Sequence, residues 1–241
     1  MFQAFILSAG LGTRLKPLTN SKPKALVEVA NISLLEHNIN KLISYSCNHI
    51  VINVHHFSEQ ILDHISKKHY ACDIYISDET ELLLDTGGAL KNARNLFDSS
   101  KDILIHNVDI LSKIDFNSLY LSHKEKFSLA TLAVSERETS RYLLFNDNEM
   151  LCGWENRNTG ERIIVNEDIK LKPYGFSGIQ FIKPALIDLI ENTDSVFSII
   201  PEYLKLSKSY PINSYIHSKD IWVDVGRIEK IKEAEKLYLN S

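Results

Sequence analysis

The sequence has 241 residues, of which 44% are hydrophobic and 24% are charged, a balance typical of a globular protein with a sizeable core. Its formal net charge of −4, without a dense basic cluster, gives no support for a nucleic-acid partner. No stretch approaches the roughly 18 consecutive apolar residues of a membrane span. We therefore expect a cytoplasmic protein that has no membrane partner.

Short apolar runs alternate with amphipathic stretches through the first half of the chain. They predict strands near residues 4–9, 49–54, 73–77 and 102–106, and helices near residues 34–45, 58–68 and 87–96. Ser58 is the predicted N-cap of the second helix. The alternation predicts an α/β fold with a doubly wound, mostly parallel central sheet and right-handed crossovers.

The pattern changes after Lys126. We expect a strand near residues 128–135, a hairpin across residues 142–155, a turn at Thr159-Gly160, a strand near residues 174–182, and helices near residues 195–205 and 227–238. No linker or repeat interrupts the sequence. The chain therefore reads as a single domain over residues 1–241, with halves of about 1–126 and 127–241 facing one cleft.

The cysteines and histidines carry little chemical signal. Cys47, Cys72 and Cys152 are odd in number and form no CxxC pair, so we expect free thiols. The pair His55-His56 and the residues that follow it lack the spacing of a metal-ligand set, and we expect no zinc site there.

The first predicted strand leads into GLGTRLKPLTNSKPK, residues 10–24. Gly10 and Gly12 let the backbone approach phosphate oxygens, and exposed N–H groups in such a turn bind anions. Arg14 can bind two phosphate oxygens at once, and Lys24 adds a compact charge. These residue types indicate a site for a nucleoside triphosphate.

Two other phosphate-binding motifs fit this segment poorly. A dinucleotide fingerprint, as in a dehydrogenase, needs a third glycine where this chain has Leu15, and Pro17 disfavours the immediate helix that follows it. The Gly-Lys-Ser/Thr of a P-loop is nowhere in the sequence.

Two aspartates follow predicted strands. Asp109 comes after the apolar run of residues 102–106, and Asp224 lies within Ile221-Trp222-Val223-Asp224-Val225-Gly226. Side chains at the carboxyl edge of a parallel sheet project into its ligand crevice. Two such carboxylates can hold one Mg²⁺ whose other ligands are phosphate oxygens and water, although a lone aspartate after a strand is commonly a turn former.

The pattern G-x-G-T-R-x-x-P-L-T-x-x-x-P-K resembles the signature of the sugar-1-phosphate nucleotidyltransferases, and every fixed position is present. The segments around Asp109 and Asp224 resemble the two metal-binding segments of that family. The resemblance covers nearly the whole chain. It is greatest to the short N-acetylmuramate 1-phosphate uridylyltransferases, and the short mannose or heptose 1-phosphate guanylyltransferases come close.

The resemblance implies a reaction between an NTP and a sugar 1-phosphate that gives an NDP-sugar and pyrophosphate, with UTP slightly favoured over GTP. It makes the first half nucleotide-binding and the second, with its antiparallel elaboration, sugar-binding. Arg14 and Lys24 would be catalytic, and Mg²⁺ would lie on Asp109 and Asp224. The implied nucleotide-binding residues are Ala9, Gly10, Gly12, Thr13, Glu79, Thr86, Gly87 and Gly88. The implied sugar-binding residues are Asn107, Gly153, Glu167, Ser177 and Gly178.

The chain departs from the family pattern at two positions, and alternatives remain open. Ala25 replaces the proline that usually follows the signature lysine, and Val108 replaces a glycine before the metal aspartate. Neither change removes a charged group. A nucleotide-sugar-sensing regulatory subunit would share the fold. A phosphocholine cytidylyltransferase would need an aromatic cage, for which Tyr142, Trp154 and Tyr174 are the candidates. A monomer and a homodimer fit equally well.

Overall fold

The computed structural model describes residues 1–167 and 170–239. The strands are β1 Gln3–Leu7, β2 Glu28–Val29, β3 Ile32–Ser33, β4 His49–Val54, β5 Asp73–Asp78, β6 Ile103–Asn107, β7 Ile110–Ser112, β8 Ala130–Ser135, β9 Arg141–Phe145, β10 Leu151–Asn156, β11 Glu161–Ile164, β12 Lys172–Ile182, β13 Ile212–Ile216 and β14 Trp222–Asp224. The α-helices are α1 Leu34–Ser44, α2 Ser58–Ser66, α3 Asp85–Asn92, α4 Phe116–Glu125, α5 Ala185–Asp188, α6 Ile199–Leu206 and α7 Ile228–Leu239. Short 3₁₀ helices are η1 Thr13–Leu15, η2 Lys24–Leu26 and η3 Arg94–Leu96.

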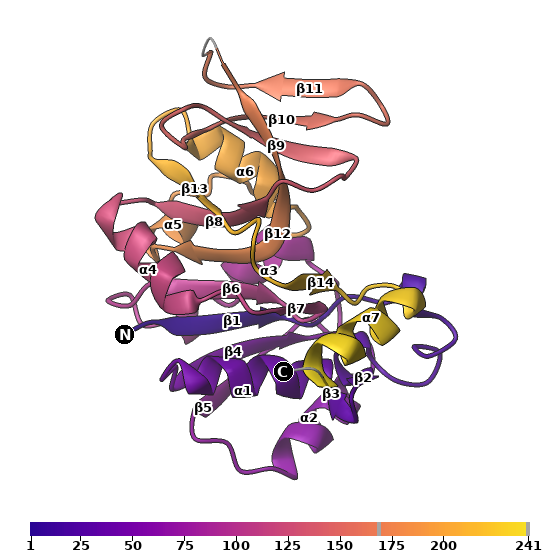
Figure 1. Cartoon of the computed structure of the whole chain (residues 1–241). Coiled ribbons are helices and arrows are strands. Elements are labelled where there is room, and N and C mark those ends of the chain that lie inside the picture. The colour runs from indigo at the N-terminus through magenta and orange to yellow at the C-terminus, as the bar shows by residue number, and fades with distance from the viewer. Residues whose placement is uncertain (168–169, 240–241) are drawn as a thin grey trace.

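One large twisted sheet runs through both halves of the described chain, in the order β11-β10-β9-β12-β6-β1-β4-β5 (Figure 1). The strands of the first half, β6, β1, β4 and β5, are parallel neighbours. The second half continues the sheet through the antiparallel pair β12–β6, while β8 pairs with both β12 and β13. The predicted α/β class, with its parallel centre and antiparallel elaboration, is confirmed.

Helices cover both faces of this sheet. One buried cluster joins Ala4, Ile6 and Leu104 of the strands to side chains of α1, α2, α4 and α7. The opposite cluster joins Phe5 and Ile105 to side chains of α3, α5 and α6. Successive residues of a strand face opposite sides of its sheet, so the continuous apolar strands at the centre supply both cores.

The predicted elements are largely present, with differences at helix starts. Phe57, in the left-handed region, is the N-cap of α2, and Ser58 is its first helical residue without a capping bond, so the predicted Ser58 cap is wrong. The helix expected from residue 195 begins at Ile199, capped by the Ser198 side chain. The unpredicted elements are helices α4 and α5, the 3₁₀ helices η1 and η2, and strands β2, β3, β7, β11 and β13.

The cysteines and the apolar character of the helices can be compared with the sequence analysis. Cys47, Cys72 and Cys152 are free thiols, as predicted. Across residues 1–167 and 170–239, none of the helices has the length and apolar character needed to cross a lipid bilayer.

Candidate active site

The turn after β1 is held from the neighbouring strand β4. Asn53 Oδ1 accepts hydrogen bonds from the backbone N–H groups of Ser8, at 2.6 Å, and Ala9, at 3.3 Å. Because β1 and β4 are parallel, both strands end at the same edge of the sheet. The side chain at the end of β4 therefore fixes the start of the glycine turn.

The backbone conformation and close neighbours of position 12 require a glycine there. Its φ of 63° lies in the left-handed region, and a Cβ there would lie 3.0 Å from both Lys24 Cβ and Thr19 Cγ2. The Thr19 hydroxyl donates a 2.9 Å hydrogen bond to the Gly12 carbonyl, and η1 begins directly afterwards. A side chain at position 12 would push these two segments apart.

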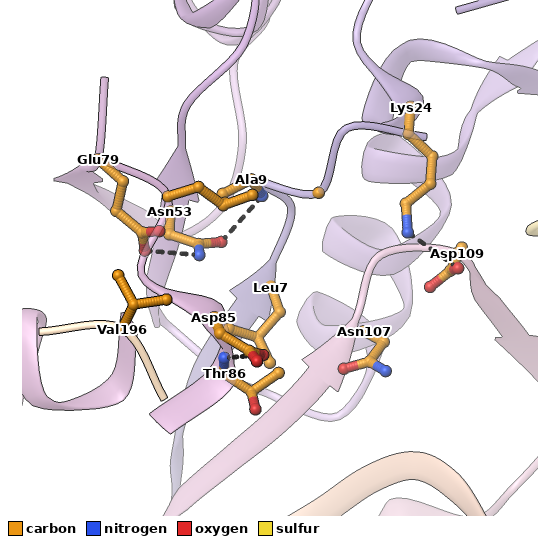
Figure 2. A pocket seen from close by; sticks show the side chains of 12 residues that line it. Leu7, Ala9, Lys24, Asn53, Glu79, Asp85, Thr86, Asn107, Asp109 and Val196 are labelled. Carbon is orange, nitrogen blue, oxygen red and sulfur yellow. Dashed lines mark hydrogen bonds and ion pairs between the residues drawn. The ribbon is translucent and has the colours of Figure 1, made fainter. Parts of the chain in front are cut away.

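Lys24 and Asp109 meet across the edge of the sheet. Lys24 Nζ lies 2.9 Å from Asp109 Oδ2, and the two side chains are only 15% and 9% exposed. Lys24 opens η2, and Asp109 follows β6 by two residues. Figure 2 shows the ammonium group pointing at this carboxylate.

A cavity of about 450 Å³ lies beside this pair. Figure 2 shows Lys24 and Asp109 on one side of it and Glu79 and Val196 on the other. Of the predicted residues, the lining includes Ala9, Gly10, Lys24, Glu79, Thr86, Asn107 and Asp109. A charged side next to one with apolar Leu83 and Val196 suits a ligand with both phosphate and heterocyclic parts.

Sequence reasoning missed part of the lining, namely Leu7, Asn53, Leu83 and Val196. Asn53 could have been found, because it is a polar residue near the end of an apolar strand that lies next to β1. Leu83 and Val196 carry no such signal, since each is an ordinary apolar residue in a loop.

Glu79 is an anchor within the protein as well as part of the cavity wall. One carboxylate oxygen accepts a 2.8 Å hydrogen bond from Asn53 Nδ2, and the other accepts from Leu84 N at 3.2 Å. Burial raises the pKa of Glu79, although these hydrogen bonds act in the opposite direction. Through Asn53, Glu79 links the loop before α3 to the glycine turn.

The Thr86-Gly87-Gly88 segment, in the first turn of α3, contacts a distant part of the chain. Phe197 O accepts from Gly87 N, at 2.9 Å, and from Gly88 N, at 3.2 Å. A Cβ at Gly87 would lie 2.4 Å from the Phe197 ring, and one at Gly88 would lie 2.2 Å from Ser195 O. These glycines therefore admit the segment that brings Val196 to the cavity, and their N–H groups are already paired.

Thr86 lies in the first turn of α3, which begins at Asp85 with Leu84 as its N-cap. Its Oγ1 accepts a 3.0 Å hydrogen bond from Ile199 N at the start of α6. The residue lines the cavity, whereas Gly87 and Gly88 do not.

Asp224 lies next to Asp109 through a two-stranded sheet. Strand β14 pairs with β7 so that Asp224 faces Ile110, and Val225 N donates a 2.8 Å hydrogen bond to Asp109 O. Arg14 Nη2 approaches Asp224 Oδ2 to 4.0 Å, and Gly226 N donates to Asp224 Oδ1 at 2.7 Å. The four charged residues of the predicted site are therefore brought together in two ion pairs.

The donor set fits a magnesium ion. Mg²⁺ takes oxygen ligands and is commonly held by one or two carboxylates together with substrate phosphates. Within the described ranges, no group of three or more His, Cys, Asp or Glu side chains is placed to hold a metal alone. Asp109 and Asp224 would thus hold Mg²⁺ only with oxygens that the substrate or water provides.

On the side of the second half, Gly178 lies against Asn107. Its φ is 72°, and a Cβ would lie 2.8 Å from Asn107 Nδ2. Ser177 is fully buried, where its hydroxyl lies 2.7 Å from His217 Nε2 and its carbonyl accepts from Trp222 Nε1 at 2.9 Å. Asn107 lines the cavity, whereas Ser177 and Gly178 do not.

Two predicted sugar-binding residues lie elsewhere. Gly153 packs within the β9–β10–β11 layer, where a Cβ would lie 2.5 Å from Ile163 O. Glu167 is exposed and lines a separate hollow with Cys152 and Tyr210. Neither residue lines the cavity that contains Lys24. Strands β9, β10 and β11 lie at the far end of the molecule from β5 (Figure 1).

Two residues of the candidate aromatic cage have little surface left for a ligand. Tyr142 and Tyr174 are only 7% and 6% exposed. The Tyr142 ring already stacks with a cation, since Arg157 Cζ lies 4.2 Å from its centroid.

Comparison with known proteins agrees with this geometry. Residues 3–144 match the family model described as nucleotidyl transferase. N-acetylmuramate alpha-1-phosphate uridylyltransferase of Caulobacter vibrioides is 30% identical over 92% of this chain and 91% of that protein. A mannose-1-phosphate guanylyltransferase catalytic subunit beta of Dictyostelium discoideum is 28% identical over 99% of this chain, which spans 65% of that protein.

Solved structures share the fold. HddC from Yersinia pseudotuberculosis, complexed with GMP-PN, superposes with a TM-score of 0.78 at 20% identity, covering 99% of this chain and 100% of that one. The family match extends over more than half of the sequence, and the Caulobacter relative aligns along nearly its whole length. This chain belongs to the nucleotidyl transferase family, as one of the sugar-1-phosphate nucleotidyltransferases that its signature predicted.

Proposed function

We propose that the protein transfers a uridylyl or guanylyl group from the NTP to a sugar 1-phosphate, giving an NDP-sugar and pyrophosphate. The observation that carries this proposal is the cavity beside the glycine turn, with the Lys24–Asp109 pair on one side and Leu83 and Val196 on the other. The charged side suits the phosphates, and the apolar side suits the base.

The chemistry requires positioning and charge stabilisation, with no protein nucleophile. A sugar phosphate oxygen attacks the α-phosphorus in line, and pyrophosphate leaves from the opposite side. Lys24 holds the α-phosphate and the incoming phosphate together, which reduces the repulsion between two anions. Arg14, which is more exposed, stabilises the charge that grows on pyrophosphate. Asp109 and Asp224 would hold Mg²⁺, which would act as a Lewis acid on the phosphate oxygens.

The free protein holds both cations on the metal-binding carboxylates. Lys24 contacts Asp109, and Arg14 lies near Asp224. In the substrate complex, Lys24 and Arg14 would turn to phosphate oxygens, and the two carboxylates would be free to hold Mg²⁺. The cost of separating the buried Lys24–Asp109 pair is offset when both charges gain new partners.

For the substrates, we propose N-acetylmuramate 1-phosphate and UTP first, because the Caulobacter relative is aligned over 91% of its length. Mannose 1-phosphate and GTP are the second pair, supported by relatives with similar identity that are longer than this chain. Heptose 1-phosphate is a further acceptor to test.

The test is pyrophosphate release with Mg²⁺ across ATP, GTP, CTP and UTP, each with N-acetylmuramate, mannose, heptose or glucose 1-phosphate. Release that requires one NTP and one sugar phosphate together supports the proposal and identifies both substrates. NTP binding without release for any pair contradicts it and favours a nucleotide-sensing subunit.

A further inference from the structure

Arg137 lies on the second half of the chain, just after β8, and carries a charge that the described protein does not neutralise. Its Nη2 donates a 2.7 Å hydrogen bond to Phe176 O. Its Nε is buried and has no hydrogen-bond partner among the described residues. No ion pair among the described residues includes Arg137. Burying an unpaired guanidinium costs free energy, and this cost falls when an anion binds to it.

The guanidinium is held in place by its neighbours. Arg137 Cζ lies 4.5 Å from the centroid of the Trp222 ring, and the Trp222 indole in turn donates to Ser177 O. Gly175 provides the space, since a Cβ there would lie 2.9 Å from Arg137 Nε. Stacking on Trp222 and the hydrogen bond to Phe176 O fix the position of the guanidinium group. Some of its N–H donors are not used by these contacts.

Strand β14 places Arg137 on the same side as Asp224. Successive side chains of a strand alternate between faces, so Trp222 and Asp224 share one face, about 6.6 Å apart along the strand. Val223 and Val225 occupy the other face and are buried in the core. Because Arg137 stacks on Trp222, its guanidinium lies on the face of β14 that also carries Asp224.

Arg137 is not among the residues that line the cavity, but strand β12, which it contacts at Gly175 and Phe176, lies against the cavity wall at Gly178. Gly178, next to Ser177 on β12, contacts Asn107 of the cavity wall and Ile110, which faces Asp224. In an in-line reaction the acceptor phosphate lies opposite the leaving pyrophosphate. Arg14 and Lys24 come from the first half, so a cation from the second half is suited to the acceptor side.

We propose that Arg137 binds the phosphate of the sugar 1-phosphate, with its free donors directed to phosphate oxygens. The inference rests on the proposed function and deepens it by assigning an acceptor-binding residue. It applies to any sugar 1-phosphate, because the ligand group is the phosphate that all of them carry. Arg137 then acts on acceptor affinity and leaves NTP binding to the first half.

The experiment compares Arg137→Met and Arg137→Lys with the matched control Arg157→Met. Arg157 also stacks on an aromatic ring, but it pairs with Glu155 in the β9–β10–β11 layer, away from the cavity. Three quantities are measured for each folded variant. They are the KM for the best sugar 1-phosphate at saturating NTP, the Kd of the NTP, and the Ki of inorganic phosphate against the sugar 1-phosphate.

Arg137→Met is expected to raise the acceptor KM and the phosphate Ki by about ten- to a hundredfold, the value of one charged hydrogen bond. The NTP Kd stays unchanged, and Arg157→Met resembles the wild type. Arg137→Lys, which keeps the charge and loses the fork, lies between. If Arg137→Met fails to fold, the same three quantities measured for Arg137→Lys still test the proposal.

An active wild type whose acceptor KM is unaffected by Arg137→Met overturns this inference alone. Equal losses in acceptor and NTP affinity also overturn it, because they indicate a purely structural role. A wild type that neither binds nor uses any sugar 1-phosphate contradicts the proposed function, and the assignment of Arg137 with it.

Discussion

The ammonium nitrogen of Lys24 lies 2.9 Å from Asp109 Oδ2, with both side chains mostly buried. Each group is the other's charge partner in the free protein, and each is also predicted to contact a different part of the reaction centre. Substitution of one therefore changes the state of the other. This coupling affects how variants at either position are interpreted.

Lys24→Met is expected to lower turnover by ~10²–10³, the loss typical of removing one preorganised electrostatic donor. It is also expected to destabilise the fold by about 1–3 kcal/mol, because Asp109 remains in the cavity wall without its partner. The measurements are the rate of pyrophosphate release at saturating substrates and the free energy of unfolding in urea.

Two further variants separate these effects. Lys16→Met removes an exposed lysine from the same loop and is expected to leave both quantities unchanged. The double variant Lys24→Met/Asp109→Asn is expected to regain stability but not turnover, because no unpaired charge remains. Near-normal turnover in Lys24→Met, with Mg²⁺ and NTP bound, contradicts the proposed role of Lys24.

Removal of the metal is expected to abolish pyrophosphate release. Excess EDTA should stop the reaction and excess Mg²⁺ should restore it, since the two carboxylates are predicted to hold the ion together with substrate and water oxygens. Asp109→Asn and Asp224→Asn should each raise the Mg²⁺ concentration needed for half-maximal rate. Activity that persists in EDTA, or an unchanged Mg²⁺ requirement in both variants, contradicts the assignment of these ligands.

Much of this arrangement follows from local sequence. The apolar runs before Gly10 and before Asp109 predicted that these two residues would lie at the carboxyl edge of one parallel sheet, and both line one cavity together with Lys24 and Asn107. The positions are observed, while the chemical roles stay predictions. Local patterns succeed here because parallel neighbouring strands bring their carboxyl ends together.

Contacts between distant segments could not be predicted in this way. Val196 reaches the cavity only because residues 195–199 dock on the start of α3, about a hundred positions earlier in the chain. The same docking takes the N–H groups of Gly87 and Gly88, which the family pattern assigned to the base. The family pattern also assigned Gly153 to the sugar site. Its actual position follows from the pairing of β10 with β9 and β11.

Gly88→Ala is expected to weaken NTP binding and to destabilise the fold by about 1–3 kcal/mol, the usual cost of overpacking. The new methyl group would lie 2.2 Å from Ser195 O, so the segment that carries Val196 must move. The measurements are the Kd of the NTP and the free energy of unfolding.

Gly153→Ala is the matched control for that variant. Its methyl group would also meet a backbone oxygen, Ile163 O at 2.5 Å, but in a layer away from the cavity. It should destabilise the protein without changing the NTP Kd. If both variants weaken NTP binding equally, general destabilisation explains the effect, and the specific role of the 195–199 segment is wrong.

Glu79→Gln is expected to change how stability depends on pH. The pKa of an unfolded glutamate is 4.5, and burial raises the pKa of Glu79 in the folded protein. Between these two values the native state binds more protons than the unfolded chain does. The free energy of unfolding contributed by Glu79 therefore falls as pH rises through this window, and stays constant above it.

Glutamine cannot ionise but keeps an oxygen that accepts from Asn53. In the variant, the free energy of unfolding should therefore lack the pH dependence that Glu79 contributes. The measurement is urea unfolding of both proteins from pH 4.5 towards neutrality, with the difference between them plotted against pH. Other carboxylates contribute to both proteins alike and cancel in that difference. A wild type that gains stability relative to Glu79→Gln as pH rises would mean that the hydrogen bonds from Asn53 and Leu84 outweigh burial. Glu79 would then be an anchor that is more stable ionised, and its charge would contribute to the position of the glycine turn.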